Sequence, residues 1–190
     1  MALEIDKETV VSTIPKNLPG ISDKRSRHIE ELVTTEGAHV RDLQLTLDVF
    51  YHPLTDEGIL TKDELRTLFI NWNELVRCSS NFLDVLHGLQ SDENRVNEIG
   101  AILIEQLSEF QPYVQFCRYL LEAIRLLQRY SSNPAFIAFD RKCASDERLS
   151  QKLNLNSYLS KPFQRLTRYP LIIEQVGEKI GIFAMYRPIM

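Results

Sequence analysis

The chain has 190 residues, of which 44% are hydrophobic and 25% charged, an ordinary composition for a soluble globular domain. Its 26 acidic and 22 basic residues give a net charge of −4, which argues against a general nucleic-acid binder. Three widely spaced cysteines, Cys78, Cys117 and Cys143, match no zinc or redox motif and indicate a reducing compartment. No stretch approaches the roughly 20 apolar residues that span a bilayer, and the first residues lack the apolar core of a secretion signal. We therefore expect a cytoplasmic protein without direct membrane insertion.

The first part of the chain predicts an arm followed by a long helix. Residues 1–22 contain two prolines and no sustained apolar period, so they are predicted to form a flexible arm. From Lys24 to Tyr51 the apolar residues recur three and four positions apart, which predicts one long amphipathic helix. Pro53 and Gly58 are predicted to end it.

The middle of the chain predicts two more long helices. Thr61 and Glu64 have the spacing of a capping box, and the helix that follows is predicted to extend through Leu86 toward a break at Gly88 and residues 91–95. A further helical pattern covers residues 99–127, and Pro112 is predicted to bend or divide it.

The last part predicts a short helix at residues 135–143 and a longer one at residues 155–176, which contains Pro162 and Pro170. No run alternates with period two, and seven glycines are few for a β-rich fold or a glycine-loop nucleotide site. The predicted fold class is therefore all-α, an elongated bundle of long helices that bury their apolar stripes against one another.

Motifs of covalent chemistry are absent from the sequence. It contains no P-loop, no nucleophile elbow and no zinc-protease motif. The histidines are predicted to be solvated residues at helix surfaces or ends; they are His28, His39, His52 and His87. We therefore expect no catalytic residue, no cofactor and no metal site.

Two carboxylates of the first predicted helix stand out. Glu36 falls on the apolar stripe between Val33 and Val40, where an unpaired charge would be costly. It is expected to reach solvent or to pair with a basic residue of another helix. Glu31 lies just beside the stripe, and both a contact with a partner protein and a solvated position remain open for it.

The segment 159–170 combines cations with apolar anchors. Three cations at i, i+4 and i+7 are predicted to share one helical face, with Gln164 beside them: Lys161, Arg165 and Arg168. The opposite face is predicted to anchor the helix to the bundle; it holds Phe163, Leu166 and Ile173. Such a stripe suits an acidic protein surface or a phosphate, and a plain solvated face is the alternative.

These segments resemble the Dbl-homology (RhoGEF) domain of Rho guanine-nucleotide exchange factors. Residues 29–43 resemble its pattern E-L-x-x-T-E-x-x-Y-V-x-D-L, with His39 where the family usually has tyrosine. Residues 158–171 resemble its most recognisable motif, which includes K-P-x-Q-R and R-Y-P-L. The matching segments at residues 69–75 and 111–117 most resemble the intersectin branch of the family. The resemblance covers about residues 24–176, so we assign the domain to residues 23–176.

The resemblance implies a monomeric exchange factor that acts by binding. It would bind a Rho-family small GTPase, of the Cdc-type branch for an intersectin-like domain, and release GDP by stabilising the nucleotide-free state. It implies that Glu31 hydrogen-bonds the first switch of the GTPase and that three residues of the last motif face the switches: Gln164, Thr167 and Arg168. Lys161 and Arg165 belong to the same motif, and each either contacts the GTPase or braces the helix. Modules outside this chain would recruit such a domain to membranes.

The resemblance ends after Val176. Residues 177–190 form a divergent tail with two glycines in five residues and Pro188, which are poor continuations of a helix. We therefore expect a truncated final helix, partly uncovered core stripes and weakened exchange activity. A non-catalytic helical adaptor remains the alternative reading, and the exchange activity of a Glu31→Ala variant distinguishes the two.

Overall fold

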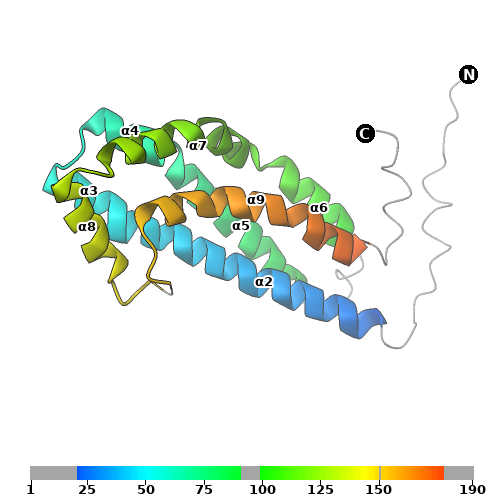
Figure 1. The fold of residues 1–190 in the computed structure, drawn as a ribbon. Coiled ribbons are helices and arrows are strands. Elements are labelled where there is room, and N and C mark those ends of the chain that lie inside the picture. The colour runs from blue at the N-terminus through cyan, green and yellow to red at the C-terminus, as the bar shows by residue number, and fades with distance from the viewer. Residues whose placement is uncertain (1–20, 91–98, 150, 178–190) are drawn as a thin grey trace, which may run out of the picture.

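A computed structural model describes residues 21–90, 99–149 and 151–177, and these residues form helices and connecting turns without a strand (Figure 1). The long helix α2 (Ile21–Thr46) continues through a π-helical turn, η1 (Leu47–Tyr51), into α3 (His52–Glu57). The helices that follow are α4 (Lys62–Phe69), α5 (Trp72–Gln90), α6 (Ile99–Ser108), α7 (Gln111–Tyr130), α8 (Pro134–Ala144) and α9 (Leu155–Gly177). The predicted all-α bundle is confirmed.

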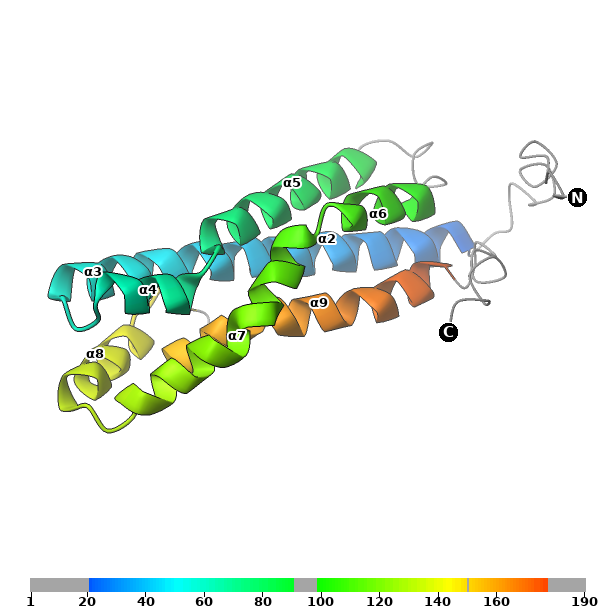
Figure 2. The ribbon, with the colours of Figure 1, turned by 90° about the horizontal axis from the view of Figure 1, so that it is seen from above.

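The bundle is elongated along α2 and α9, which lie side by side (Figures 1 and 2). Helices α3, α4 and α8 gather near one end of α2, and α6 lies toward the other end. One core of buried apolar side chains runs through the bundle. Its largest members include Phe50, Trp72, Phe82, Phe116 and Tyr158, each at most 2% exposed.

The first long helix does not end at Pro53, so that prediction was wrong. Pro53 has no N–H and cannot bond the carbonyl of Val49, four residues earlier. The thiol of Cys143 donates to that carbonyl at 3.1 Å, and the chain widens into the π-helical turn just before the proline. Gly58 ends the helix in the left-handed conformation, with φ 63°, as predicted.

The second predicted helix is divided in two, although its capping box between Thr61 and Glu64 is confirmed. Ile70, with φ 30°, interrupts the helix between α4 and α5. Tertiary hydrogen bonds stabilise this break. The Asn71 amide donates to the Pro112 carbonyl at 2.9 Å, and the Trp72 indole donates to the Leu43 carbonyl at 2.9 Å. Helix α5 then continues through Gly88 to Gln90, so the predicted break at Gly88 was wrong. The other predicted break, at residues 91–95, lies outside the described residues.

The later boundaries agree with the sequence. Pro112 stands at the beginning of α7 and separates it from α6, as predicted. Helix α9 contains Pro162 and Pro170 and spans the predicted range. The predicted arm, apart from its last two residues, and the predicted tail after Gly177 lie outside the described residues. Among the described helices, none is both long and apolar enough to cross a membrane.

Two glycine substitutions test the left-handed end at Gly58 and the helical backbone at Gly37, and they should change the unfolding free energy in opposite directions. Gly58→Ala forces a Cβ onto a left-handed residue with no neighbouring atom within 4 Å, so its cost is purely conformational, about 1–2 kcal/mol of unfolding free energy. Gly37→Ala lies inside α2, where the new Cβ would meet Leu83 Cδ2 at 4.0 Å, an ordinary contact. It should raise the unfolding free energy by about 0.5–1 kcal/mol. Urea unfolding measures both, and shifts in the same direction would contradict the assignment.

Candidate functional site

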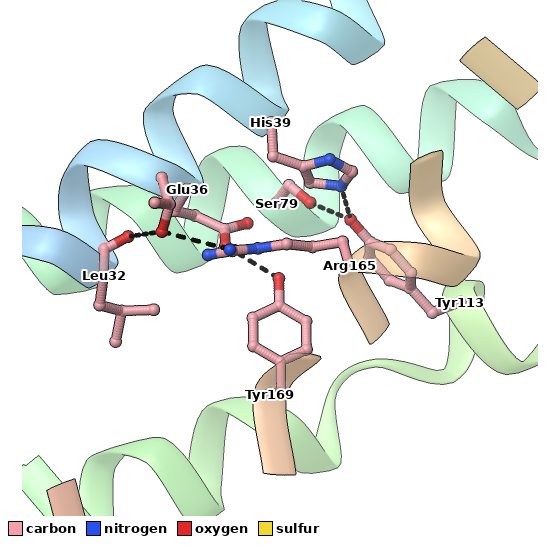
Figure 3. A network of polar contacts seen from close by, with 8 residues as sticks. Leu32, Glu36, His39, Ser79, Tyr113, Arg165 and Tyr169 are labelled. Atoms are coloured by element: carbon pink, nitrogen blue, oxygen red, sulfur yellow. Dashed lines mark hydrogen bonds and ion pairs between the residues drawn. The ribbon is translucent and has the colours of Figure 1, made fainter. Parts of the chain in front are cut away.

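A buried ion pair joins α2 to α9 near the middle of the bundle (Figure 3). The guanidinium of Arg165 donates to Glu36 Oε2 from Nε at 2.9 Å and from Nη2 at 2.6 Å. The hydroxyl of Tyr169 donates to the same oxygen at 2.9 Å. The side chains of Glu36 and Arg165 are 0% and 6% exposed. Of the two expectations for Glu36, pairing with a basic residue of another helix is confirmed.

The environment of this pair acts on both charges. Burial raises the pKa of Glu36, and the charge and hydrogen bonds of Arg165 oppose that shift. Burial also works against the charge of Arg165, but Glu36 outweighs it, so the pKa of Arg165 is raised. Glu36 therefore holds Arg165 in its charged form, while Arg165 opposes the effect of burial on the Glu36 carboxyl. The loss of either group would leave its partner in the interior without the opposite charge.

A second ion pair and a histidine continue the contact between the two helices. Lys161 Nζ lies 2.6 Å from Asp42 Oδ2, with both side chains largely covered. Glu36, His39 and Asp42 are three residues apart and therefore share one face of α2. We call these three residues, together with Lys161 and Arg165, the α2–α9 seam. Its pairing order shows that the two helices run antiparallel.

His39 is buried, 6% exposed, so the prediction that it is solvated was wrong. Its Nε2 is hydrogen-bonded to the Tyr113 hydroxyl of α7 at 2.7 Å, and that hydroxyl is also hydrogen-bonded to Ser79 of α5 (Figure 3). Burial, together with the nearby charges of Arg165 and Lys161, lowers the pKa of His39 to about 3. A histidine can occupy an interior face when its ring stays neutral and finds a partner, as here.

Aromatic rings cover this polar network on the side of α5 and α7. The ring of Tyr169 packs edge-on against Phe82 at 5.8 Å and Phe110 at 5.2 Å between centroids. Phe110 stacks on Tyr113 at 5.0 Å. The guanidinium of Arg165 lies over the Tyr169 ring, 4.9 Å from its centroid. The network is thus shielded from water, which strengthens its hydrogen bonds and ion pairs.

A pocket of about 230 Å³ lies at the end of the seam nearest the beginning of α2. Its lining comes from α2 and α9 alone: His28, Glu31, Leu32, Thr35, Arg165, Arg168, Leu171 and Ile172. Glu31 is 70% exposed, and its Oε2 lies 3.9 Å from His28 Nδ1. Arg165 reaches from the buried pair to this wall, donating from Nη1 to the Thr35 hydroxyl at 3.2 Å. The α2–α9 pocket therefore continues the antiparallel seam and brings Glu31 and Arg168 to opposite walls.

The exposed face of α9 borders this pocket. Gln164, Thr167 and Arg168 are all exposed on it. Phe163 is 47% and Leu171 60% exposed, so two large apolar side chains also face solvent there. The exposed face of α9 therefore presents both polar and apolar groups next to the pocket.

The structure corrects the predicted faces of α9. The three cations do not share an exposed face, because Lys161 and Arg165 turn inward to the carboxylates of α2 and only Arg168 is exposed. Phe163 was predicted to anchor the helix, but it points to solvent. The carboxylates of α2 supply the reason, since a face that offers charge partners draws the lysine and the arginine inward.

Other features of the molecule lie away from the predicted site. A cavity of about 420 Å³ lies between α7, α8 and the beginning of α9, and none of the predicted site residues lines it. Across the described ranges, no group of three His, Cys, Asp or Glu side chains is placed to hold a metal ion. The sequence analysis did not single out Thr35 and Leu171 as pocket residues, although Thr35 is the threonine of the pattern E-L-x-x-T-E and Leu171 is the leucine of R-Y-P-L.

The chain belongs to the RhoGEF domain family, whose model matches residues 28–180. Intersectin-1 of Mus musculus is 39% identical over 159 residues, which cover 82% of this chain and 9% of that protein. Rho guanine nucleotide exchange factor 1 of Mus musculus is 35% identical over 172 residues, which cover 85% of this chain and 18% of that protein. The chain therefore spans only a small part of the length of these curated relatives.

Solved structures of this family share the fold. The DH/PH domains of p115-RhoGEF match with a TM-score of 0.75 at 31% identity, covering 90% of this chain and 49% of that one. The DH/PH fragment of PDZRHOGEF, solved in complex with human RhoA, matches with a TM-score of 0.74 at 26% identity. That match covers 90% of this chain and 49% of the other. The predicted Dbl-homology fold is confirmed.

Breaking the buried ion pair should cost far more stability than breaking an exposed one. Arg165→Met leaves the Glu36 carboxylate unpaired in the interior and should lower the unfolding free energy by about 3–5 kcal/mol. Lys142→Met breaks the exposed pair with Glu57, whose side chains are 74% and 38% exposed, and should cost at most about 1 kcal/mol. The double variant Glu36→Leu/Arg165→Met buries no charge and should recover most of the loss. Urea unfolding at pH 7 measures all three, and a double variant no more stable than Arg165→Met would contradict this account.

His39 should make stability fall in mild acid. In the unfolded chain its pKa is about 6.5, whereas in the folded chain it is about 3, so the unfolded state binds an extra proton between these values. Above pH 6.5 neither state protonates His39, so this residue leaves the unfolding free energy unchanged. As the pH falls below 6.5, proton binding by the unfolded chain lowers the unfolding free energy, by about 2 kcal/mol at pH 5. Because burial also raises the pKa of Glu36, His39→Gln, which cannot bind this proton, is the reference. Urea unfolding at pH 7.5 and 5.0 should show the stability difference between the two chains change by that amount; a constant difference would refute the assignment.

Proposed function

We propose that this chain is a guanine-nucleotide exchange domain that binds a Rho-family small GTPase through the α2–α9 pocket and the exposed face of α9. The observation that carries the proposal is the convergence of Glu31, Arg168 and the exposed Leu171 around one pocket. Membership of the RhoGEF family and the complex of PDZRHOGEF with human RhoA support a GTPase as the partner.

The surface is chemically suited to a protein partner. Glu31 offers hydrogen-bond acceptors on one wall, and Arg168 offers a fork of donors on the other. Gln164 and Thr167 add neutral polar groups, while Phe163 and Leu171 offer apolar area that binding would remove from water. A small GTPase that exposes both backbone and side-chain groups in its switch segments could be bound at all of these points.

Exchange by this surface would need no covalent step. A surface that binds the nucleotide-free GTPase more tightly than the GDP-bound form lowers the barrier to GDP release by the difference in binding free energy. The proposed contact residues are Glu31, Gln164, Thr167 and Arg168, with Phe163 and Leu171 beside them. Lys161 and Arg165, which the sequence also pointed to, would brace α9 from inside the seam, because both are bonded to carboxylates of α2.

The branch of the Rho family stays a prediction. The resemblance to intersectins favours the Cdc-type branch, whereas the related structure in complex with RhoA favours the Rho-type branch. Nucleotide release measured against a panel of Rho-family GTPases decides between them. The same assay measures whether exchange is weakened, as the sequence after Val176 predicts, and complex formation without acceleration would favour the helical adaptor instead.

Substitutions on the two pocket walls test the proposed surface. Glu31→Ala and Arg168→Ala should each lower the exchange rate by at least about tenfold, because each removes a charged hydrogen-bonding group at the centre of the surface. Glu30→Ala, at the exposed neighbouring carboxylate outside the pocket, is the matched control and should change the rate by less than about twofold. Release of a fluorescent GDP analogue measures the rates, and circular dichroism checks folding. Full exchange in both pocket variants would place the surface elsewhere.

A further inference from the structure

The charges of the α2–α9 seam balance only if His39 stays neutral. Glu36 and Asp42 are paired with Arg165 and Lys161, so each carboxylate already has its cation. A protonated imidazole between them would compete with Arg165 for Glu36, and burial would strengthen that competition. The geometry of the Glu36–Arg165 pair therefore depends on the groups that keep the His39 ring neutral and in place.

Two other helices hold it. The Tyr113 hydroxyl of α7 bonds both His39 Nε2 and the Ser79 hydroxyl of α5, so this one oxygen joins three helices (Figure 3). The ring of Tyr113 also stacks on Phe110, which packs edge-on against Tyr169, and the Tyr169 hydroxyl donates to Glu36 Oε2. Tyr113 and Ser79 are both 0% exposed, so bulk water does not compete for these bonds. Removal of the Tyr113 hydroxyl would take a partner from His39 and from Ser79 at once.

Arg165 connects the buried Glu36 carboxyl to the wall of the pocket. Its Nε and Nη2 are bonded to Glu36, and its Nη1 is bonded to Thr35 on the pocket wall. Because the guanidinium is planar and rigid, a change in the position of the Glu36 carboxylate also moves Nη1. Thr35 is therefore tied through Arg165 to groups that never touch the pocket.

We infer that His39, Tyr113 and Ser79 are positioning residues for the α2–α9 pocket, acting through the Glu36–Arg165 pair. The inference rests on the proposed function, because it takes this pocket to be the GTPase-binding surface. The competing explanation is a role in packing alone. In that case the Tyr113 hydroxyl would matter no more than the hydroxyl of another buried tyrosine on the same core.

Tyr113→Phe removes only the hydroxyl, and Tyr158→Phe is its matched control. Tyr158 is also 0% exposed, and its hydroxyl donates to the Gln151 carbonyl at 3.0 Å, near the beginning of α9 and away from the pocket. In the whole chain without a GTPase, the Nε–H signal of Arg165 in 15N NMR should shift or broaden in Tyr113→Phe and stay in place in Tyr158→Phe. An unchanged signal in a folded Tyr113→Phe chain would overturn the inference.

The second measurement is GDP release from the responding GTPase at increasing concentrations of the exchange domain. Tyr113→Phe should lower the maximal rate about fivefold and change the half-saturating concentration less than about twofold, because the positioned groups act on the nucleotide-free state. Tyr158→Phe should change both by less than about twofold. His39→Gln, whose amide can reach the Tyr113 hydroxyl, should keep the rate, and His39→Leu should lose it. Equal rates in the two tyrosine variants would assign the network to packing.

Failure of this inference is distinguishable from failure of the proposed function. A wild-type chain that accelerates release from no Rho-family GTPase would refute the function. The Arg165 signal would still show whether Tyr113 positions the pocket wall, since that measurement needs no partner.

Discussion

The bond between Glu36 and Arg165 constrains the rest of the molecule more than any other interaction. A carboxyl group and a guanidinium lie in the interior, and burying charges costs several kcal/mol per ion unless their geometry is very good. Here the guanidinium donates twice to one carboxylate oxygen and Tyr169 donates once. A slide of α9 along α2 by one helical turn, about 5.4 Å, would separate the charges entirely. The pair therefore determines the register of the two longest helices and, with it, which side chains meet at the pocket.

Most of the fold was predictable from the sequence, because helical periodicity and turn chemistry are local signals. The capping box at Thr61 and the left-handed end at Gly58 follow from neighbouring residues alone, and both were confirmed. The wrong boundaries arose where distant groups intervene. Pro53 fits inside a helix because Cys143, ninety-four positions after Val49, donates to the Val49 carbonyl, which the proline cannot bond. Ile70 breaks a helix whose pattern is continuous, because Asn71 bonds a carbonyl of α7. The local sequence pattern gives no information about these distant hydrogen-bond partners.

The site was predictable only in part, for a related reason. The sequence showed that Glu36 needed a partner but could not name Arg165, since a helical wheel gives angles within one helix and not the neighbour that each face meets. For the same reason, the sequence analysis placed the cations of α9 on one face and Phe163 against the bundle. The structure shows the reverse: Lys161 and Arg165 turn inward and Phe163 is exposed. A usable signal was present nonetheless. Glu36, His39 and Asp42 are three residues apart, and such a polar row on an otherwise apolar stripe indicates a buried polar network rather than three solvated residues.

The polar character of the seam is itself informative. In proteins, replacing a buried ion pair with well-packed apolar residues is often neutral or stabilising, so stability alone does not account for two ion pairs and a neutral histidine there. An apolar seam, however, tolerates small slides and rotations, because its attraction is not directional. A surface that distinguishes two states of a partner must keep its contact groups in place, since only differential binding changes the partner's equilibrium. Directional bonds along the seam, from Lys161 through Arg165 to Thr35, hold one geometry up to the edge of the pocket. The interior network and the exposed surface are thus consecutive parts of a single contact between α2 and α9.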